Sequence, residues 1–267
     1  MFQIITRDLK DRWISLLSYS LGSLSLALLY TSIYGSVQQS QEQLAKLYNA
    51  FPKALYEAFG IQDLVINTLP KFLGLELFSF MWPILAIFLV VSRAAGSITG
   101  EIERGTLGLY LALPVSRTNL YWSKYTSSLV AILIFVSVSI VGIIPIAALF
   151  NQDISISIIF RLALLGLLFM WAVYAFSMCL ACLFSEKSKV YMSVGILMAT
   201  MYAINVVAGL KSSLGWLHNY SVFYYFDSQT VLNKNVFDTT SLIVFGIAIV
   251  VFTVLGLLAF RRRDIYV

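Results

Sequence analysis

The chain has 267 residues, of which 60% are apolar and only 12% are charged. That charged share is about half of the share in an ordinary soluble domain, and a soluble protein of this size could not hide so much apolar surface in one core. The composition therefore excludes an ordinary soluble protein. The net charge of +5 would suit nucleic-acid binding, but the positions of the charges give it a different meaning, described below.

The first residues have the pattern of an amphipathic helix. Phe2, Ile5, Leu9, Trp13 and Leu16 recur at spacings of three and four, and the charged residues of this stretch lie elsewhere around the helix. Such a helix is expected to lie on the inner membrane surface. The apolar run that follows is too long for the core of a signal peptide, so we expect it to remain in the mature protein.

Six apolar segments are each long enough to cross a bilayer as a helix, which takes about 20 residues. They cover residues 16–37, 75–98, 125–150, 158–184, 190–210 and 241–260, and none carries a charge near its middle. In lipid each segment must satisfy its own backbone hydrogen bonds, which a helix does. The sequence therefore predicts an all-α integral membrane protein in which residues 1–267 form one domain.

The distribution of Lys and Arg indicates the orientation of the predicted spans. One side of the membrane receives both termini and twelve of the 18 basic residues: Arg7, Lys10, Arg12, Arg93, Arg104, Arg117, Lys124, Lys187, Lys189, Arg261, Arg262 and Arg263. Basic residues close to span ends are enriched on the cytosolic side. We therefore expect cytosolic termini, and we interpret the net positive charge as a topology signal rather than as a nucleic-acid site.

Small residues recur on one face of several spans, where they allow close helix packing. They are Ser18, Gly22 and Ser25 in the first span, Gly96 in the second, and Gly195, Ala199 and Ala203 in the fifth. These faces are predicted to pack against other helices or a second subunit, or to line a pathway. Pro83 in the second span is expected to kink that helix.

The connection between the second and third spans carries the most informative motif, EIERGTLGLYLALPVSR at residues 101–117. Its acidic pair is followed by Gly105, which allows the helix to break, and then by leucines at every second position, which need a surface to cover them. Pro114 ends the element. This charged and then apolar element suits the docking of a soluble partner, although an ordinary cytosolic loop would also explain it.

The same motif resembles the hallmark of the ABC type-2 permeases, the membrane subunits of ATP-driven exporters. The amphipathic N-terminal helix, the six spans, the basic C-terminus and the aromatic stretch NYSVFYYFDSQ at residues 219–229 are similar as well, although Val222 replaces the proline usual there. The resemblance implies that the element at residues 101–117 is a coupling helix, which contacts an ATPase subunit. The residues implied in this contact are Glu101, Glu103, Arg104, Gly105, Thr106, Pro114 and Arg117.

The resemblance also implies the partners, since no complete phosphate-binding loop occurs in this chain. ATP with Mg²⁺ is expected on a separate ATPase chain, and no cofactor on this one. A second permease subunit, identical or different, is expected to complete the pathway for an amphipathic drug, peptide or lipid-like substrate. The membrane would be the plasma membrane of a bacterium or archaeon.

Two other functions stay open at this point. An ion-coupled secondary transporter usually has titratable groups inside its spans; the six segments contain no acid near their middle, but a carrier that uses carbonyls and hydroxyls would need none. An intramembrane enzyme could use His218, the only histidine, as a base. The pair Cys179 and Cys182 could be a redox or metal pair. We interpret the histidine as an interfacial side chain and the cysteines as small buried residues, so no catalysis is expected.

Overall fold

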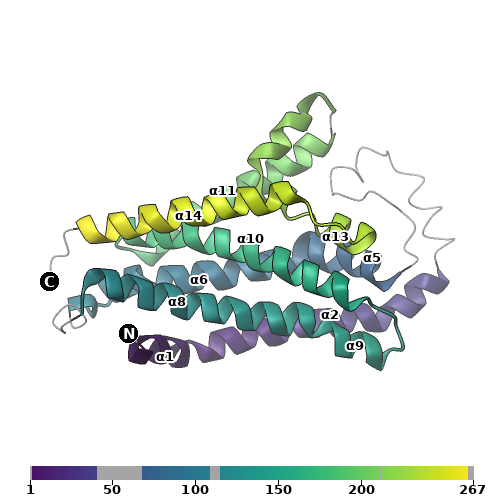
Figure 1. Cartoon of the computed structure of the whole chain (residues 1–267), viewed down its shortest axis with the longest axis horizontal. Coiled ribbons are helices and arrows are strands. Elements are labelled where there is room, and N and C mark those ends of the chain that lie inside the picture. Colours follow the sequence, from purple (N-terminus) through teal and green to yellow (C-terminus); the bar gives the residue numbers. More distant parts are fainter. Residues whose placement is uncertain (1, 41–67, 109–114, 211, 264–267) are drawn as a thin grey trace.

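The structure is a computed structural model that describes residues 2–40, 68–108, 115–210 and 212–263. Throughout these ranges the regular elements are helices, without a strand. The long helices lie side by side along the longest axis of the molecule (Figure 1). The all-helical fold predicted from the apolar segments is therefore confirmed.

Within the described residues, six helical segments are long and apolar enough to cross a membrane. The first is α2 (Trp13–Gln39). The second joins α5 (Leu69–Leu73), η1 (Gly74–Met81) and α6 (Trp82–Glu103), and the third joins α8 (Arg117–Val136), η2 (Ser137–Val141) and α9 (Ile143–Leu149). The others are α10 (Ile156–Leu183), α11 (Lys187–Leu210) and α14 (Thr239–Arg262). Several helices extend past the apolar residues, because backbone hydrogen bonding continues into the charged ends.

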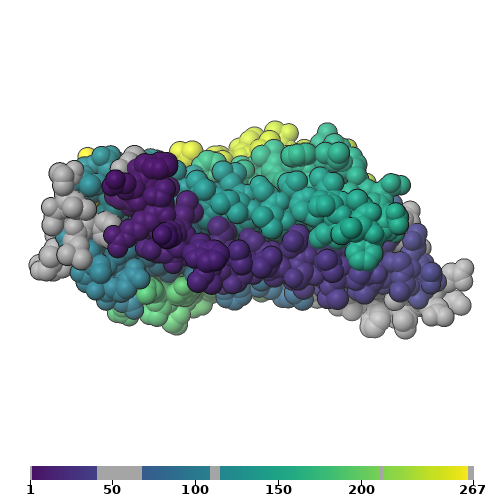
Figure 2. All heavy atoms as spheres, turned by 90° about the horizontal axis from the view of Figure 1, so that it is seen from below, coloured from purple at the N-terminus to yellow at the C-terminus, as the bar shows by residue number. Residues whose placement is uncertain are grey.

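The N-terminal residues form the helix α1 (Phe2–Asp11), which packs mainly against α8. Figure 2 shows α1 in dark purple across one end of the molecule, with α2 continuing along the same face. Phe2 and Trp13 are exposed, but Asp8 is buried. We expected Asp8 among the outward-facing charges, and this placement on the wheel is wrong. That α1 lies on the membrane surface stays a prediction.

Two spans change their helix type within a turn before a proline. The π-helix η1 precedes Pro83 in the second span, and the π-helix η2 precedes Pro145 in the third. Proline lacks the N–H that the preceding helical turn would bind, and its ring crowds the carbonyl of that turn. A π-helical turn moves the bonding pattern by one residue. Pro83 therefore marks a change from π- to α-helix, next to the buried Trp82.

The helix α10 occupies the centre of the bundle and contacts α14, α6 and α8. Two glycines permit the closest approaches. A Cβ added at Gly166 in α10 would lie 2.8 Å from the Trp82 ring, and one added at Gly256 in α14 would lie 3.1 Å from the Cα of Cys179. Gly166 therefore makes room for the Trp82 side chain of α6, and Gly256 lets the backbone of α14 approach that of α10 closely.

The fifth span lies at the edge of the bundle. The 3₁₀-helix η3 (Ser212–Tyr220) packs back against α11, and this hairpin projects from the side of the molecule (Figure 1). The chain then re-enters through α12 (Val222–Tyr225) and α13 (Ser228–Lys234). Phe226 between them stacks on Trp82 with ring centres 5.5 Å apart. Val222 begins α12 without the usual proline, because the Ser221 side chain caps the turn by accepting from the Phe223 N–H.

Candidate functional site

One end of the bundle, which we call the basic end, gathers most of the basic residues. It carries α1, the carboxyl end of α6, the start of α8, the turn between α10 and α11, and the end of α14 (Figure 1). The first and last described residues, Phe2 and Arg263, belong to elements that lie at this end. The side chains that connect these elements form the candidate site.

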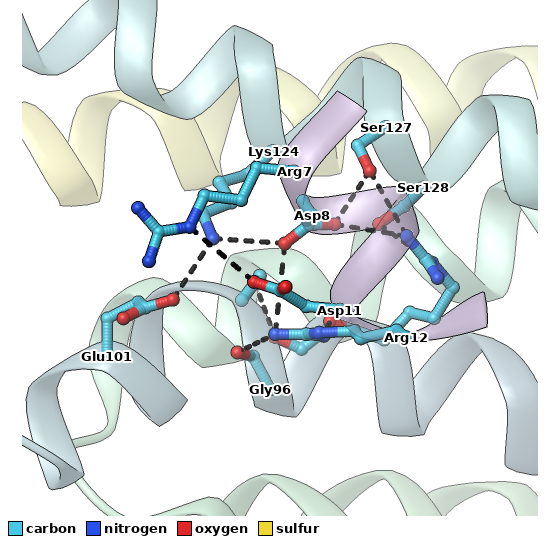
Figure 3. A network of polar contacts seen from close by, with 12 residues as sticks. Arg7, Asp8, Asp11, Arg12, Gly96, Glu101, Lys124, Ser127 and Ser128 are labelled. Atoms are coloured by element: carbon cyan, nitrogen blue, oxygen red, sulfur yellow. Dashed lines mark hydrogen bonds and ion pairs between the residues drawn. The ribbon is translucent and has the colours of Figure 1, made fainter. Parts of the chain in front are cut away.

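A buried ionic cluster at the basic end joins three helices (Figure 3). It consists of Asp8 from α1, Arg93 and Glu101 from α6, and Lys124 from α8. The Asp8 carboxylate lies 3.1 Å from Arg93 Nη2 and 3.0 Å from Lys124 Nζ. Lys124 Nζ also lies 3.1 Å from Glu101 Oε1. One lysine therefore bridges two carboxylates on different helices.

Hydroxyl groups complete the cluster from the side of α8. Ser127 Oγ donates to Asp8 Oδ2 over 2.6 Å and accepts from Arg93 Nη2 at 3.1 Å, and Ser128 Oγ lies 3.4 Å from Arg93 Nε. A buried charge is tolerated only when it is paired and hydrogen-bonded. The two serines meet this requirement because they lie one helical turn beyond Lys124.

The ionisation of Asp8 follows from these contacts. Burial alone would raise the pKa of its carboxyl group, but Lys124, Arg12, the Ser127 hydroxyl and Arg93 together hold that pKa below its usual value. The favourable charges outweigh the loss of hydration. Asp8 is therefore an anion at neutral pH and serves as the common acceptor of the cluster.

Arg12 extends the cluster along α6 and explains one of the predicted small residues. Its guanidinium donates to the carbonyl of Arg93 over 2.8 Å and to the carbonyl of Gly96. A Cβ at Gly96 would lie 2.6 Å from Arg12 Nη1. Gly96 therefore makes room for an arginine from the N-terminal segment, whereas the sequence pattern predicted packing against another helix.

The carboxyl end of α6 has the Schellman geometry. The Thr106 N–H donates to the Glu101 carbonyl and the Gly105 N–H to the Ile102 carbonyl, each at 2.9 Å. Gly105 has φ of +69°, a left-handed conformation that glycine adopts without strain. The Thr106 hydroxyl also donates to the Glu101 carboxylate. The helix end is thus connected directly to the ionic cluster.

The predicted ATPase contacts fall into two groups. Glu103, Arg104 and Gly105 are exposed, whereas the Glu101 side chain is buried in the cluster. Arg117 begins α8 and donates to the carbonyl of Arg263 at the end of α14. Pro114 lies outside the described residues. The structure therefore brings Glu101 and Thr106 together on the inner side of the loop and leaves residues 103–105 on its surface.

The predicted small-residue faces point away from the bundle. The side chains of Ser18 and Ser25 in α2, and of Ala199 and Ala203 in α11, are exposed. An added Cβ at Gly22 or Gly195 would meet no atom within 4 Å. Among the described residues nothing packs against Gly22 or Gly195, so these faces are open to lipid or to another subunit.

Sequence reasoning missed the ionic cluster itself. Arg93 and Lys124 were interpreted as topology charges at span ends, and Asp8 as a surface charge, yet all three side chains are at most 4% exposed. A signal was available: Arg93 lies within a continuous apolar helix, ten residues before α6 ends. A lone basic residue at such a depth needs an acidic partner.

The fold thus defines a multi-pass helical membrane protein with one polar end. The family model described as ABC-2 family transporter protein matches residues 4–265. The chain therefore belongs to this family and is the membrane subunit of an ABC transporter. No curated protein matches its sequence.

Family membership decides among the functions that the sequence left open. The membrane subunits of this family transport and do not catalyse; ATP hydrolysis belongs to a separate protein with which they generally work. The chain is therefore neither an intramembrane enzyme nor, by family, an ion-coupled secondary transporter. The acidic groups of the cluster are consistent with this conclusion, because each is paired with a cation.

Proposed function

We propose that this chain is the permease subunit of an ATP-driven exporter and that the ionic cluster transmits ATPase movement into the membrane. The observation that carries the proposal is the position of Lys124, which binds Asp8 of α1 and Glu101 of α6 at once. A force applied to the loop between α6 and α8 is thereby distributed over three helices.

The exposed part of the loop supplies the ATPase contact in this proposal. Glu103 and Arg104 project from the last turn of α6, and Gly105 fixes the direction in which the chain leaves it. The hydrogen bonds from residues 105 and 106 back to α6 make this corner stiff. Rigid-body movement of a soluble subunit needs such a stiff, charged handle joined to a spanning helix.

The orientation follows from the basic end. It carries the described termini and most of the lysines and arginines, so it faces the cytosol by the positive-inside rule. The membrane is the plasma membrane of a bacterium or archaeon. ATP and Mg²⁺ bind the partner ATPase and not this chain.

A second permease subunit completes the pathway in this proposal. Six spans are few for an export path, and the exposed faces of α2 and α11 carry small residues that permit close approach of another helix. The subunit is the same chain or a related one. Apolar walls suit an amphipathic drug, a peptide or a lipid-like substrate that moves outward.

Co-purification tests the central claim. The tagged chain, solubilised in a mild detergent, should retain an ATPase subunit at one copy per permease. Reversing the exposed charge in Glu103→Lys should lower ATPase retention, or uncouple ATP hydrolysis from transport. Glu186→Lys is the matched control, because Glu186 is an equally exposed acid in the α10–α11 turn. A chain that retains no ATPase in any of several mild detergents, or a Glu103→Lys variant with full transport, would contradict the proposal.

A further inference from the structure

Arg263, which follows α14, lies on the carboxyl end of α10. Its Nη1 donates to the carbonyls of Cys182 and Phe184 over 2.8 and 2.9 Å, and its Nη2 donates to Ser185 Oγ over 2.6 Å. The last carbonyls of a helix have no partner within the helix, and they form the negative end of its dipole. The Arg263 guanidinium thus binds two carbonyls at the end of α10 and connects α14 to the α10–α11 turn.

The backbone of the same residue binds α8. The carbonyl of Arg263 accepts from Nη1 of Arg117, the first residue of α8 and the point where the loop after α6 returns to the membrane. Arg263 therefore has two separate connections. Its side chain binds the α10–α11 turn, and its backbone binds the start of α8.

Further contacts close these connections into a ring around the basic end. Lys187, at the start of α11, lies 3.4 Å from Glu103 of α6, and its side chain covers Gly100. Lys124 joins α8 to α6 through Glu101. The Glu103–Lys187 pair is partly exposed, and such pairs contribute little to stability. The contacts of Arg263 are therefore the stronger link to the last three spans.

We propose that Arg263 is a positioning residue that couples the start of α8 to the α10–α11 turn. A displacement of the loop between α6 and α8 then reaches α10, α11 and α14 as well as the second and third spans. The use of this connection in transport rests on the proposed function. The connection itself is a property of this chain and can be measured without the ATPase.

The buried thiol of Cys182 is a natural reporter, because its own carbonyl is one of the two that Arg263 binds. The full-length chain in membranes is treated with N-ethylmaleimide, and modification of each cysteine is followed by mass spectrometry. Arg263→Ala should speed modification of Cys182 about tenfold, the ratio for losing about 1.4 kcal/mol of charged hydrogen bonding. Arg262→Ala is the matched control; Arg262 is exposed and its loss should leave the rate unchanged.

Arg117 provides the decisive variant. Arg117→Ala should also speed modification of Cys182, and combining it with Arg263→Ala should add little, because both act on one connection. Arg117→Lys should keep the modification of Cys182 slow, since the lysine ammonium group can still donate to the Arg263 carbonyl. An unchanged rate in Arg117→Ala, or fully additive effects in the double variant, would overturn the proposal.

A second result would overturn it as well. If Arg263→Ala accelerated modification of Cys179 as much as that of Cys182, the variant would have loosened the fold as a whole. The faster modification of Cys182 would then not come from the loss of this one connection. Cys179 lies three residues deeper in α10, against Gly256. Failure of this test leaves the co-purification of an ATPase unaffected, so the two proposals fail separately.

Discussion

Asp8 and Arg93 lie 85 residues apart in the sequence, yet the Asp8 carboxylate is 3.1 Å from Arg93 Nη2 and both side chains are almost fully buried. The pair fixes the N-terminal helix to the second span inside the bundle. Removing both charges from water costs several kcal/mol per ion, and the surrounding lysine, arginine and serine groups offset that cost. The loss of a single member would therefore leave a buried charge without its full compensation.

Neutralising Asp8 should destabilise the protein strongly. Asp8→Asn leaves Arg93 and Lys124 buried with one anion fewer, and breaking a buried pair in this way costs about 3–5 kcal/mol. Thermal unfolding in detergent should show a clearly lower midpoint. Asp11→Asn is the control, because Asp11 forms only an exposed pair with Arg7 and should change the midpoint little. Equal midpoints for the two variants would contradict a structural role for the cluster.

The contribution of Asp8 should depend on pH in the acidic range only. Its pKa in the folded protein lies below the ordinary value of 3.8 because of Lys124, Arg12, Ser127 and Arg93, which outweigh the effect of burial. The unfolded chain therefore binds more protons as the pH falls through this range, and the stabilisation is lost on acidification. The difference in midpoint between wild type and Asp8→Asn should stay constant from neutral pH to about pH 4.

Below pH 4 that difference should shrink as the carboxyl group becomes protonated in the folded state. A difference that already disappears between pH 7 and pH 5 would show that the pKa of Asp8 is raised in the folded protein, against the geometry of its four partners.

A methyl group at Gly96 should displace Arg12. The added Cβ of Gly96→Ala would lie 2.6 Å from Nη1 of the guanidinium, so Arg12 must give up its bonds to the Arg93 and Gly96 carbonyls. Losing hydrogen bonds from a charged group costs about 1.5–3 kcal/mol. Gly22→Ala is the control, because open space surrounds Gly22. Limited proteolysis of the N-terminal segment should accelerate in Gly96→Ala and not in Gly22→Ala.

Gly105 should tolerate only residues that accept a left-handed backbone. Its φ of +69° costs an alanine about 1–2 kcal/mol, so Gly105→Ala should loosen the end of α6. Hydrogen exchange at the N–H groups of residues 105 and 106 should accelerate. Gly105→Asn should have a smaller effect, because asparagine visits this conformation more readily. Identical exchange rates in wild type and Gly105→Ala would contradict the Schellman geometry.

The sequence predicted the helices of this protein well and its ionic cluster poorly. Six runs of apolar residues sufficed for the spans, since any such run in lipid must be helical. The break after Glu103 was also visible, because Gly105 follows an acidic pair. Asp8, by contrast, lies among Arg7, Lys10 and Asp11, and a helical wheel assigns all four to one polar side. Burial distinguishes Asp8 from its neighbours only once α8 packs across α1.

The exposed stripes on α2 and α11 show the same limit. Spacing marks Gly22 and Gly195 as possible contacts, but only the packed bundle shows that the described part of the chain leaves them uncovered.

The sequence by itself predicted a multi-pass helical membrane protein with six apolar segments and with most of its basic residues on one side. Hydrophobic length and charge asymmetry act locally, and each segment carries its own share of the signal. Only the tertiary structure decided which charges meet: Asp8 with Arg93 and Lys124, Glu101 with Lys124, and Arg117 with the carbonyl of Arg263. A charge pair forms where two helices approach within a few ångströms, and that distance depends on how all the other side chains pack.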